Sequence, residues 1–138
     1  MFDDLSKYER HGHFFFKKGD SLATASKGVP LLQGIYYIMR LAGGRVDLVY
    51  IGKSGTIGQD GSFKTQSLRA RINNTADGGS RQTFFESKFI EENIDGLDIY
   101  WYVTMDKTYE DLPGYVEGLL MQAYFEIFGK LPPWNKCF

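Results

Sequence analysis

Two strand-like segments, 34–40 and 46–52, give the chain its clearest hydrophobic pattern, because both are rich in Ile, Val and Tyr. Between them, Ala42-Gly43-Gly44 is typical of a turn, so the pattern predicts a β-hairpin. A third strand is predicted over 97–105. Its apolar residues alternate with more polar ones: Ile99, Trp101 and Val103 against Tyr100, Tyr102 and Thr104.

The register of the hairpin decides which side chains share a face of the sheet, because cross-strand partners point the same way. A three-residue loop over 42–44 would place Tyr36 directly opposite Tyr50. A two-residue loop at Gly43-Gly44 would send the two tyrosines to opposite faces, because a slip of one residue flips the side chains. A joint role for the tyrosines therefore needs the three-residue loop.

Three helices are predicted from apolar residues at helical spacing. The first begins near Thr65 or Ser67, the second spans 82–93, and the third begins near Pro113 and ends before Gly129. The large apolar residues of the last two helices and of the third strand are predicted to form the core: Phe84, Phe85, Phe89, Trp101, Leu119, Leu120, Phe125 and Phe128.

These elements fit a single domain, since 138 residues are about the size that one hydrophobic core supports. We predict an α+β fold in which a small three-stranded antiparallel sheet is flanked by helices. Residues 34–138 are expected to form the core of that domain. Residues 1–33 are expected to form an N-terminal arm, with a short helix followed by a loop.

Composition and charge narrow the functional classes. Hydrophobic residues make up 43% of the chain and charged residues 24%, and no apolar run approaches the ~20 residues that cross a bilayer. The first residues do not resemble a secretory signal, and a single cysteine excludes an internal disulfide, so we expect a cytoplasmic protein. The net charge of −1 argues against a general nucleic-acid binder. Segment 64–81 nevertheless holds four basic residues and one acid, Asp77, which indicates either a basic patch or a solvated helix face.

Six motifs follow one another on the predicted elements. They are Pro30 ahead of Gly34-Ile35-Tyr36, the hairpin, Tyr50-Ile51-Gly52-Lys53-Ser54, Leu68-x-x-Arg71-Ile72, a final helix that carries a glutamate, and Pro132-x-Trp134-Asn135. In this order the set resembles the GIY-YIG nuclease superfamily over roughly residues 29–136. The resemblance implies hydrolysis of a phosphodiester bond in DNA, with Mg²⁺ or Mn²⁺ as cofactor.

The resemblance also implies which residues act in catalysis: Tyr36, Tyr50, Lys53, Arg71, Glu117 and Asn135. Tyr50 is expected to be the general base, with Tyr36 as its partner or alternate, and Lys53 is expected to favour the Tyr50 phenolate. Arg71 is expected to hold the phosphate with its forked donors. Arg69 is the competing residue, but two helical positions away it would point in another direction.

The metal-binding carboxylate stays open between two positions of the last helix. Glu117 is the ligand if the segment follows the pattern E-x-x-L-[IM], whereas an ungapped match to E-A-L-L-L-E puts Gln122 at the metal position. We favour Glu117, because an amide has no charge to offer a dication. A glutamine in that place would leave a protein that binds DNA without cutting it.

Other residues are expected in supporting roles. Lys64, Arg69 and Arg81 are expected to contact DNA, and Asn135 to hydrogen-bond across the site and fix the C-terminal tail. Thr75 stands where many relatives carry His or Tyr, so that role is missing or supplied from elsewhere.

The leading hypothesis is a metal-dependent DNA endonuclease of restriction or repair type. The alternative is a catalytically silent DNA-binding or regulatory domain of the same fold. A third hypothesis is an interaction module whose aromatic residues bind another protein. The expected partner is DNA rather than a membrane, and a homodimer or a further protein could supply the specificity for which so small a domain has little room.

Overall fold

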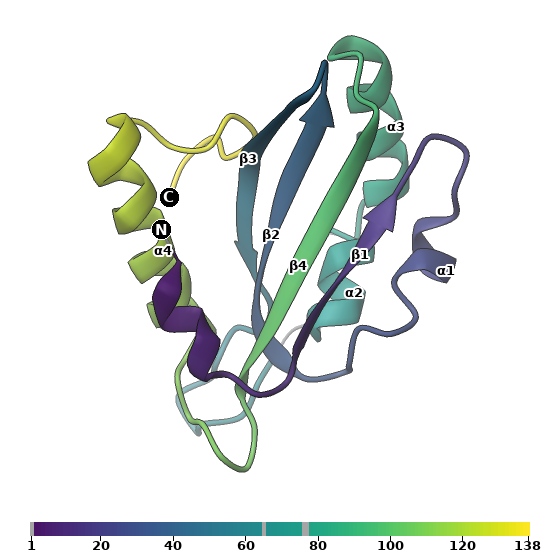
Figure 1. Cartoon of the computed structure of the whole chain (residues 1–138). Coiled ribbons are helices and arrows are strands. Elements are labelled where there is room, and N and C mark those ends of the chain that lie inside the picture. The colour runs from purple at the N-terminus through teal and green to yellow at the C-terminus, as the bar shows by residue number, and fades with distance from the viewer. Residues whose placement is uncertain (1, 65, 76–77) are drawn as a thin grey trace.

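The computed structural model describes residues 2–64, 66–75 and 78–138 and contains a four-stranded antiparallel sheet in the order β1-β4-β2-β3 (Figure 1). The strands are β1 (His11–Phe16), β2 (Gln33–Ala42), β3 (Arg45–Lys53) and β4 (Gly96–Met105). The outer strands are therefore β1 and β3. Thr65, one of the two starts predicted for the first helix, and Asp77, the acid of the basic segment, lie outside the described residues.

The fourth strand corrects the predicted three-stranded sheet, although the α+β class holds. β1 lies in the segment that was expected to be an arm, and it pairs with β4, His11 opposite Tyr102 and Phe16 opposite Leu97. The sequence HGHFFF lacks the β-branched residues that mark the other strands. Its partner lies more than eighty residues away, so this pairing depends on tertiary contacts that a local pattern does not reveal.

The helices begin and end at local signals in the sequence. They are η1 (Asp3–Lys7), α1 (Leu22–Ala25), α2 (Leu68–Asn73), α3 (Arg81–Glu91) and α4 (Pro113–Phe128). Ser67 and Ser80 cap α2 and α3 by accepting hydrogen bonds from backbone N–H groups of the first turn. α4 has Pro113 in its first turn and ends at Gly129, whose φ of 68° is left-handed. The three predicted helices are thus confirmed.

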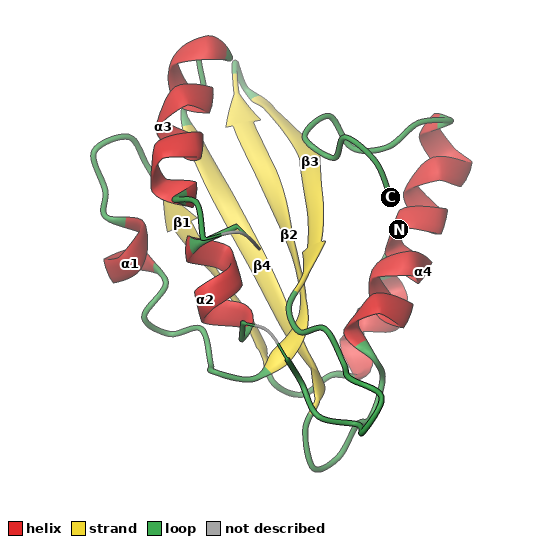
Figure 2. Ribbon diagram, turned by 180° about the vertical axis from the view of Figure 1, so that it is seen from behind, coloured by secondary structure: helices red, strands yellow, loops and turns green. Residues whose placement is uncertain are grey.

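The sheet separates two hydrophobic cores. The core on one face lies under α1, α2 and α3 and contains Phe16, Tyr36, Ile38, Leu68, Phe85 and Leu97 (Figure 2). The core on the other face lies under η1 and α4 and contains Leu5, Ile35, Ile51, Val116, Leu120 and Met121. Each face of the central strand β2 is therefore buried by a different set of elements.

Four of the predicted core residues lie at the surface instead. Phe84, Leu119, Phe125 and Phe128 have exposed fractions of 37%, 44%, 50% and 49%. Three of them belong to α4, which is apolar on more than one side and contacts the sheet along only one of them. The spacing of apolar residues predicts a helix. It does not show which side of the helix packs on the sheet when apolar residues lie on several sides.

The hairpin turn contains two residues rather than three. Ala42 pairs with Arg45, and between them Gly43 and Gly44 have φ values of 58° and 77°. Two consecutive positive φ angles belong to the tight hairpin turn whose twist matches that of the flanking strands. Of the two loop lengths considered, the structure has the shorter one, and not the three-residue loop that a joint role of the tyrosines was expected to need.

A β-bulge in β3 changes the consequence of that turn. Between Ile38 and Met39 the register with β3 shifts by one residue, which leaves Val49 as the extra residue. Because a shift of one residue flips the side chains, Tyr36 and Tyr50 return to the same face, as diagonal rather than direct neighbours. The tyrosines share a face through the bulge, not through the length of the turn.

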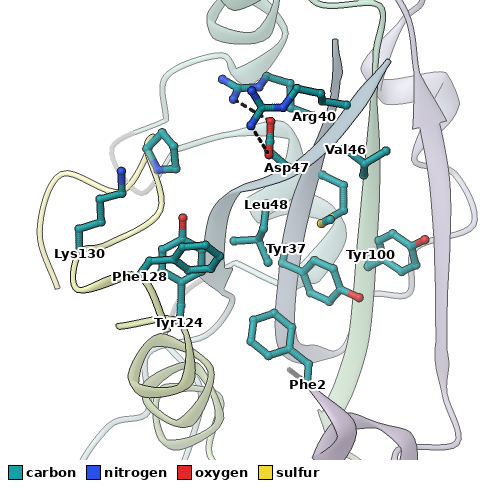
Figure 3. A pocket seen from close by; sticks show the side chains of 13 residues that line it. Phe2, Tyr37, Arg40, Val46, Asp47, Leu48, Tyr100, Tyr124, Phe128 and Lys130 are labelled. Atoms are coloured by element: carbon teal, nitrogen blue, oxygen red, sulfur yellow. Dashed lines mark hydrogen bonds and ion pairs between the residues drawn. The ribbon is translucent and has the colours of Figure 1, made fainter. Parts of the chain in front are cut away.

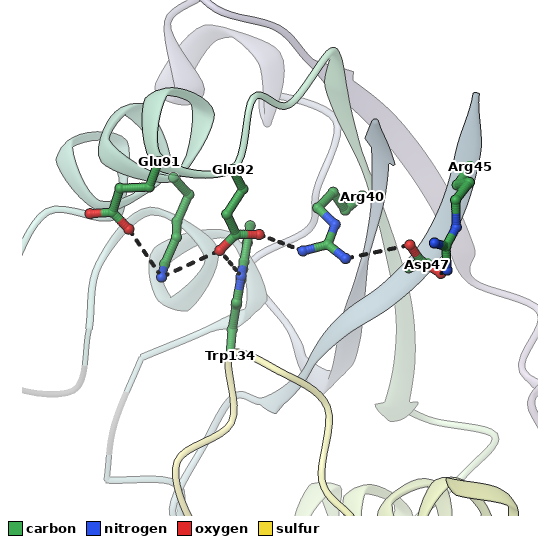
Figure 4. A network of polar contacts seen from close by, with 7 residues as sticks. Arg40, Arg45, Asp47, Glu91, Glu92 and Trp134 are labelled. Atoms are coloured by element: carbon green, nitrogen blue, oxygen red, sulfur yellow. Dashed lines mark hydrogen bonds and ion pairs between the residues drawn. The ribbon is translucent and has the colours of Figure 1, made fainter. Parts of the chain in front are cut away.

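The C-terminal tail closes over the outer strand β3 at this bulge. The backbone N–H of Trp134 donates to the carbonyl of Val49 at 2.8 Å, and its indole N–H donates to Glu92 at 2.9 Å. Glu92 also accepts from Arg40, which reaches on to Asp47 (Figure 4). One polar network thus joins the end of α3, the hairpin and the tail. Among the described residues, none of the helices has the length and apolar character needed to cross a membrane.

We predict that this network makes stability depend on acid. Burial alone would raise the pKa of Glu92, but hydrogen bonds from Arg40 and Trp134 hold it below its ordinary value of 4.5. A carboxyl group whose pKa falls on folding stabilises the folded state above the unfolded pKa, and this contribution is lost as the pH falls through the folded pKa. In urea denaturation from about pH 6 to about pH 3, the free energy of unfolding should fall less for Glu92→Gln than for the unmodified protein.

The matched control is Glu91→Gln, since the Glu91 side chain is 61% exposed and meets only Lys88 among the described residues. Its pH dependence should follow that of the unmodified protein. If the free energy of unfolding fell equally with pH for Glu92→Gln and the unmodified protein, Glu92 would not be a source of the acid dependence.

Candidate functional site

The site begins with two aromatic rings that meet over a glycine. The ring centroids of Tyr36 and Tyr50 are 5.9 Å apart, and Gly52 lies directly opposite Tyr36 in the sheet. A Cβ atom on Gly52 would lie 2.6 Å from Cζ of Tyr36 and 2.7 Å from Cε2 of Tyr50. Tyr36 is 1% exposed and has no room to move aside. The glycine of Tyr50-Ile51-Gly52 therefore provides the space in which the tyrosines meet.

The glycine of the other tripeptide fixes the start of β2. A Cβ atom on Gly34 would lie 1.9 Å from the backbone oxygen of Tyr102, so any side chain would separate β2 from β4. The backbone N–H of Gly34 donates to the buried hydroxyl of Ser54 at 3.0 Å, and the N–H of Ser54 donates back to the carbonyl of Gly34 at 2.9 Å. Gly34 and Ser54 thereby hold the end of β3 beside the start of β2.

Arg81, the first residue of α3, reaches both tyrosines from the helical side. Its Cζ lies 5.0 Å from the ring centroid of Tyr50 and 5.8 Å from that of Tyr36, and its Nη2 donates to the Tyr50 hydroxyl at 3.3 Å. The residue is only 7% exposed, and its Nε is buried without a hydrogen-bond partner. Among the described residues no carboxylate forms an ion pair with it. A buried guanidinium without a carboxylate is costly unless an anion joins it.

Two more cations approach from other elements. Lys53 ends β3, and Arg71 lies on α2, with its Nε buried and without a hydrogen-bond partner. Neither forms an ion pair within the described part of the chain. Glu117, half-buried in the second turn of α4, lies in the electric field of both: burial raises its pKa, while Lys53 and Arg71 act in the opposite direction. The structure thus brings Lys53 and Arg71 near Glu117, and Arg71 also acts on Tyr36. Lys53 pairs with Ile35 and so shares the other face of the sheet from the two tyrosines.

The environments of Tyr36 and Tyr50 differ. Complete burial raises the pKa of Tyr36 well above its ordinary value of 10.0, although Arg81 and Arg71 oppose the shift. Tyr36 therefore stays protonated at neutral pH and is suited to donating a hydrogen bond. Tyr50 is half-buried, and its oxygen accepts from Arg81. Of the two, Tyr50 has the more suitable environment for a proton acceptor.

Asn135 holds the tail rather than facing into the site. Its Oδ1 accepts from the backbone N–H of Ile51 at 3.0 Å, and its Nδ2 donates to the carbonyl of the same residue at 2.9 Å. The side chain therefore binds β3 as a neighbouring strand would, next to Tyr50. By contrast, Gln122 is exposed and donates to Glu126 at 3.0 Å. Of the two positions considered for a metal ligand, Glu117 is the one that faces the cations.

The carboxylate of Glu117 is free to take a ligand. Among the described residues it makes no hydrogen bond and no ion pair. Over the same described residues, no group of three or more His, Cys, Asp or Glu side chains gathers in a way that could hold a metal ion. A hard cation at Glu117 would therefore depend largely on water and substrate oxygens, as Mg²⁺ commonly does.

The three residues expected to contact DNA lie in different settings. Lys64 is exposed and lies 3.9 Å from Asp60. Arg69 donates through its Nε to the carbonyl of Val29 at 2.7 Å, which ties it to the loop before β2. Arg81 is buried within the site. Sequence spacing assigned Arg81 to a surface because nothing near it in the chain shows its proximity to Tyr50, thirty-one residues earlier.

A small cleft of about 220 Å³ opens next to Lys53. It lies between the loop after β3, with Gly55 and Phe63, and the start of α4 at Pro113. A larger pocket of about 630 Å³ lies elsewhere, against Tyr37 and Tyr124 on the face of the sheet under α4. Of the site residues named above, Lys53 alone lines the small cleft and none lines the larger pocket, so we place the site by its chemical groups rather than by pocket size.

No protein-family model matches the chain, and no curated protein and no solved structure gives a significant match to it.

We predict that Gly52→Ala destabilises the protein by about 1–3 kcal/mol, the usual cost of forcing an extra methyl group into a packed core. The cause is the approach of the new methyl to the buried Tyr36 ring, at 2.6 Å without rearrangement. Thermal or urea unfolding measures the change. Gly118→Ala is the matched control, because its Cβ would meet Phe138 at an ordinary 3.7 Å. In that helical position alanine should stabilise by up to ~1 kcal/mol. Equal stability of Gly52→Ala and the unmodified protein would show that the two rings are not packed as described.

Proposed function

We propose that the protein is a metal-dependent DNA endonuclease of the GIY-YIG type. The observation that carries this proposal is a set of three cations: Arg81 lies against the two tyrosines, and Lys53 and Arg71 lie near one free carboxylate, Glu117. None of the three forms an ion pair among the described residues. Unpaired cations at a partly buried site favour an anionic ligand, and the phosphates of DNA are such a ligand.

Hydrolysis of a phosphodiester requires a base for the attacking water, positive charge for the phosphate, and help for the departing oxygen. In the proposed mechanism Tyr50 takes the proton from water as the water oxygen attacks phosphorus in line with the bond that breaks. Arg81 holds the Tyr50 oxygen in place through its hydrogen bond, with its guanidinium over the Tyr50 ring. The protonated Tyr36 is buried beside Tyr50 and supports that residue rather than reaching the substrate.

The remaining groups act on the phosphate. Arg71 is half-buried and presents a forked guanidinium that suits two phosphate oxygens at once. Lys53 borders the cleft and can meet the charge on the oxygen that leaves. Lys53 was expected to act on Tyr50, but Arg81 is the cation that contacts this tyrosine. We therefore assign the support of Tyr50 to Arg81 and the leaving oxygen to Lys53.

Glu117 is the residue that would hold Mg²⁺ or Mn²⁺. Its carboxylate is half-buried and without hydrogen bonds to the described residues, which fits a ligand for a hard cation. When bound, such a cation neutralises charge on the phosphate oxygens. As such an enzyme, with one cysteine and thus no internal disulfide, the protein would act in the cytoplasm.

We predict that the protein nicks supercoiled plasmid in Mg²⁺ or Mn²⁺, measured by gel electrophoresis at a fixed enzyme concentration. Tyr50→Phe should reduce the rate by at least ~100-fold, because phenylalanine keeps the ring but loses the base. Glu117→Gln should cause a loss of similar size, because it removes the charge on the metal ligand. Gln122→Ala is the control and should cut at the unmodified rate, because Gln122 is exposed and contacts only Glu126 among the described residues.

No cleavage in either metal by the folded protein would overturn the proposed activity. Cleavage that survives Glu117→Gln and is lost in Gln122→Ala would overturn the choice of ligand alone.

One observation favours a second candidate, a DNA-binding domain that does not cut. Within the described residues no group of three or more His, Cys, Asp or Glu side chains forms around Glu117. A silent domain of this kind would bind DNA with an affinity that falls steeply as salt rises, and would leave the plasmid intact. Fluorescence anisotropy with a labelled duplex, run beside the nicking assay, separates the two candidates.

A further inference from the structure

The pocket of about 630 Å³ lies on the opposite face of the sheet from Tyr36 and Tyr50, between the sheet and the second half of α4 (Figure 3). Its volume is within the ~300–1,000 Å³ that is typical of small-molecule sites. It shares no lining residue with the proposed nuclease site. An occupant of this pocket would therefore be a separate ligand.

Aromatic side chains line the pocket from two sides. Tyr37 and Tyr100 project from the sheet, and Tyr124 and Phe128 project from α4 (Figure 3). The rings of Tyr37 and Tyr100 are stacked, with centroids 4.9 Å apart and planes 9° apart, and His13 continues the stack at 4.8 Å and 10°. This cross-strand stack holds the sheet wall in place before any ligand binds. Tyr37 is flanked by Tyr100 and Tyr102, and Tyr100 by Tyr37 and His13, so the sheet wall offers ring edges. Such edges suit the face of a flat ring system in an edge-to-face contact.

The rim of the pocket carries a net positive charge. Its lining includes three cations, Arg40, Arg45 and Lys130, and one carboxylate, Asp47. Asp47 is already engaged by both arginines, at 3.4 Å and 3.6 Å. Lys130 forms no ion pair within the part of the chain that the structure describes. The rim is thus suited to a ligand that carries negative charge at one end.

We propose that this pocket binds a nucleobase that carries a phosphate. The base lies between the tyrosines of the sheet and the aromatic residues of α4, and the phosphate lies at the rim near Arg45 and Lys130. Planar shape and terminal negative charge occur together in this ligand, which meets both features of the pocket. A free mononucleotide and the phosphorylated end of a single strand share this chemistry.

Isothermal titration calorimetry with the intact chain tests the proposal. AMP should bind, whereas adenosine and ribose 5-phosphate should each bind at least tenfold more weakly, because each lacks half of the recognised chemistry. Phe128→Ala should weaken AMP binding by at least tenfold. Phe128 is 49% exposed, so this variant should stay folded, which its thermal melt checks. Lys130→Ala should weaken AMP binding while leaving adenosine unchanged.

The matched control is Phe125→Ala, because Phe125 is equally apolar, 50% exposed and on α4 but does not line the pocket. Glu117→Gln should also bind AMP normally, so that failure of the nuclease proposal and failure of this one remain distinguishable. A 5′-phosphorylated single-stranded oligonucleotide is the second probe. If it binds much more tightly than AMP, and Phe128→Ala abolishes that binding, the end of a strand is the ligand. Comparable affinities identify the free nucleotide.

Two results would overturn the proposal. One is the absence of heat for both AMP and the oligonucleotide up to millimolar concentration. The other is binding that Phe128→Ala leaves unchanged, or that ribose 5-phosphate matches, since neither would involve stacking of a base.

Discussion

The candidate site depends on one extra residue in an outer strand. The two-residue turn at Gly43-Gly44 would by itself place Tyr36 and Tyr50 on opposite faces, and the bulge at Val49 brings them to the same one. The C-terminal tail holds the strand on both sides of Tyr50, through Trp134 at Val49 and Asn135 at Ile51. The Pro132-x-Trp134-Asn135 motif therefore positions the strand that carries Tyr50-Ile51-Gly52. This coupling explains why a Trp-Asn pair near the C-terminus belongs with tyrosines in a hairpin.

A second constraint is the charge that this arrangement leaves unpaired. Arg81 is buried against both tyrosines with no carboxylate beside it among the described residues, and burial of an uncompensated charge opposes folding. The two hydrophobic cores on either side of β2 and the network around Glu92 offset that cost. Groups that lower the stability of a folded protein cluster at functional sites.

Much of this architecture could be predicted from local patterns. Strand β4, the ends of α3 and α4 and the hairpin itself follow from periodicity, capping serines, Pro113 and Gly129. Strand β1 was missed because its partner is distant and its sequence lacks β-branched residues, and the bulge was missed because the tail helps to stabilise it. Helical spacing also could not show that Phe125 and Phe128 lie on an uncovered side of α4. In the site, the resemblance indicated Tyr36, Tyr50, Lys53, Arg71 and Glu117, which the structure brings together. It gave no sign that Arg81 lies against the two tyrosines, because only the packing of α3 on the sheet brings that residue there.

The central claim is that buried cations serve a phosphate-cleaving site at the expense of stability. The most direct test is the variant Arg81→Met, with thermal unfolding and plasmid cleavage measured on the same preparation. Methionine fills a similar volume without charge, so we predict unchanged or higher stability together with a loss of cleavage of about 100-fold or more. The opposite result, a clear loss of stability with an unchanged cleavage rate per folded molecule, would contradict that claim and make Arg81 a structural residue.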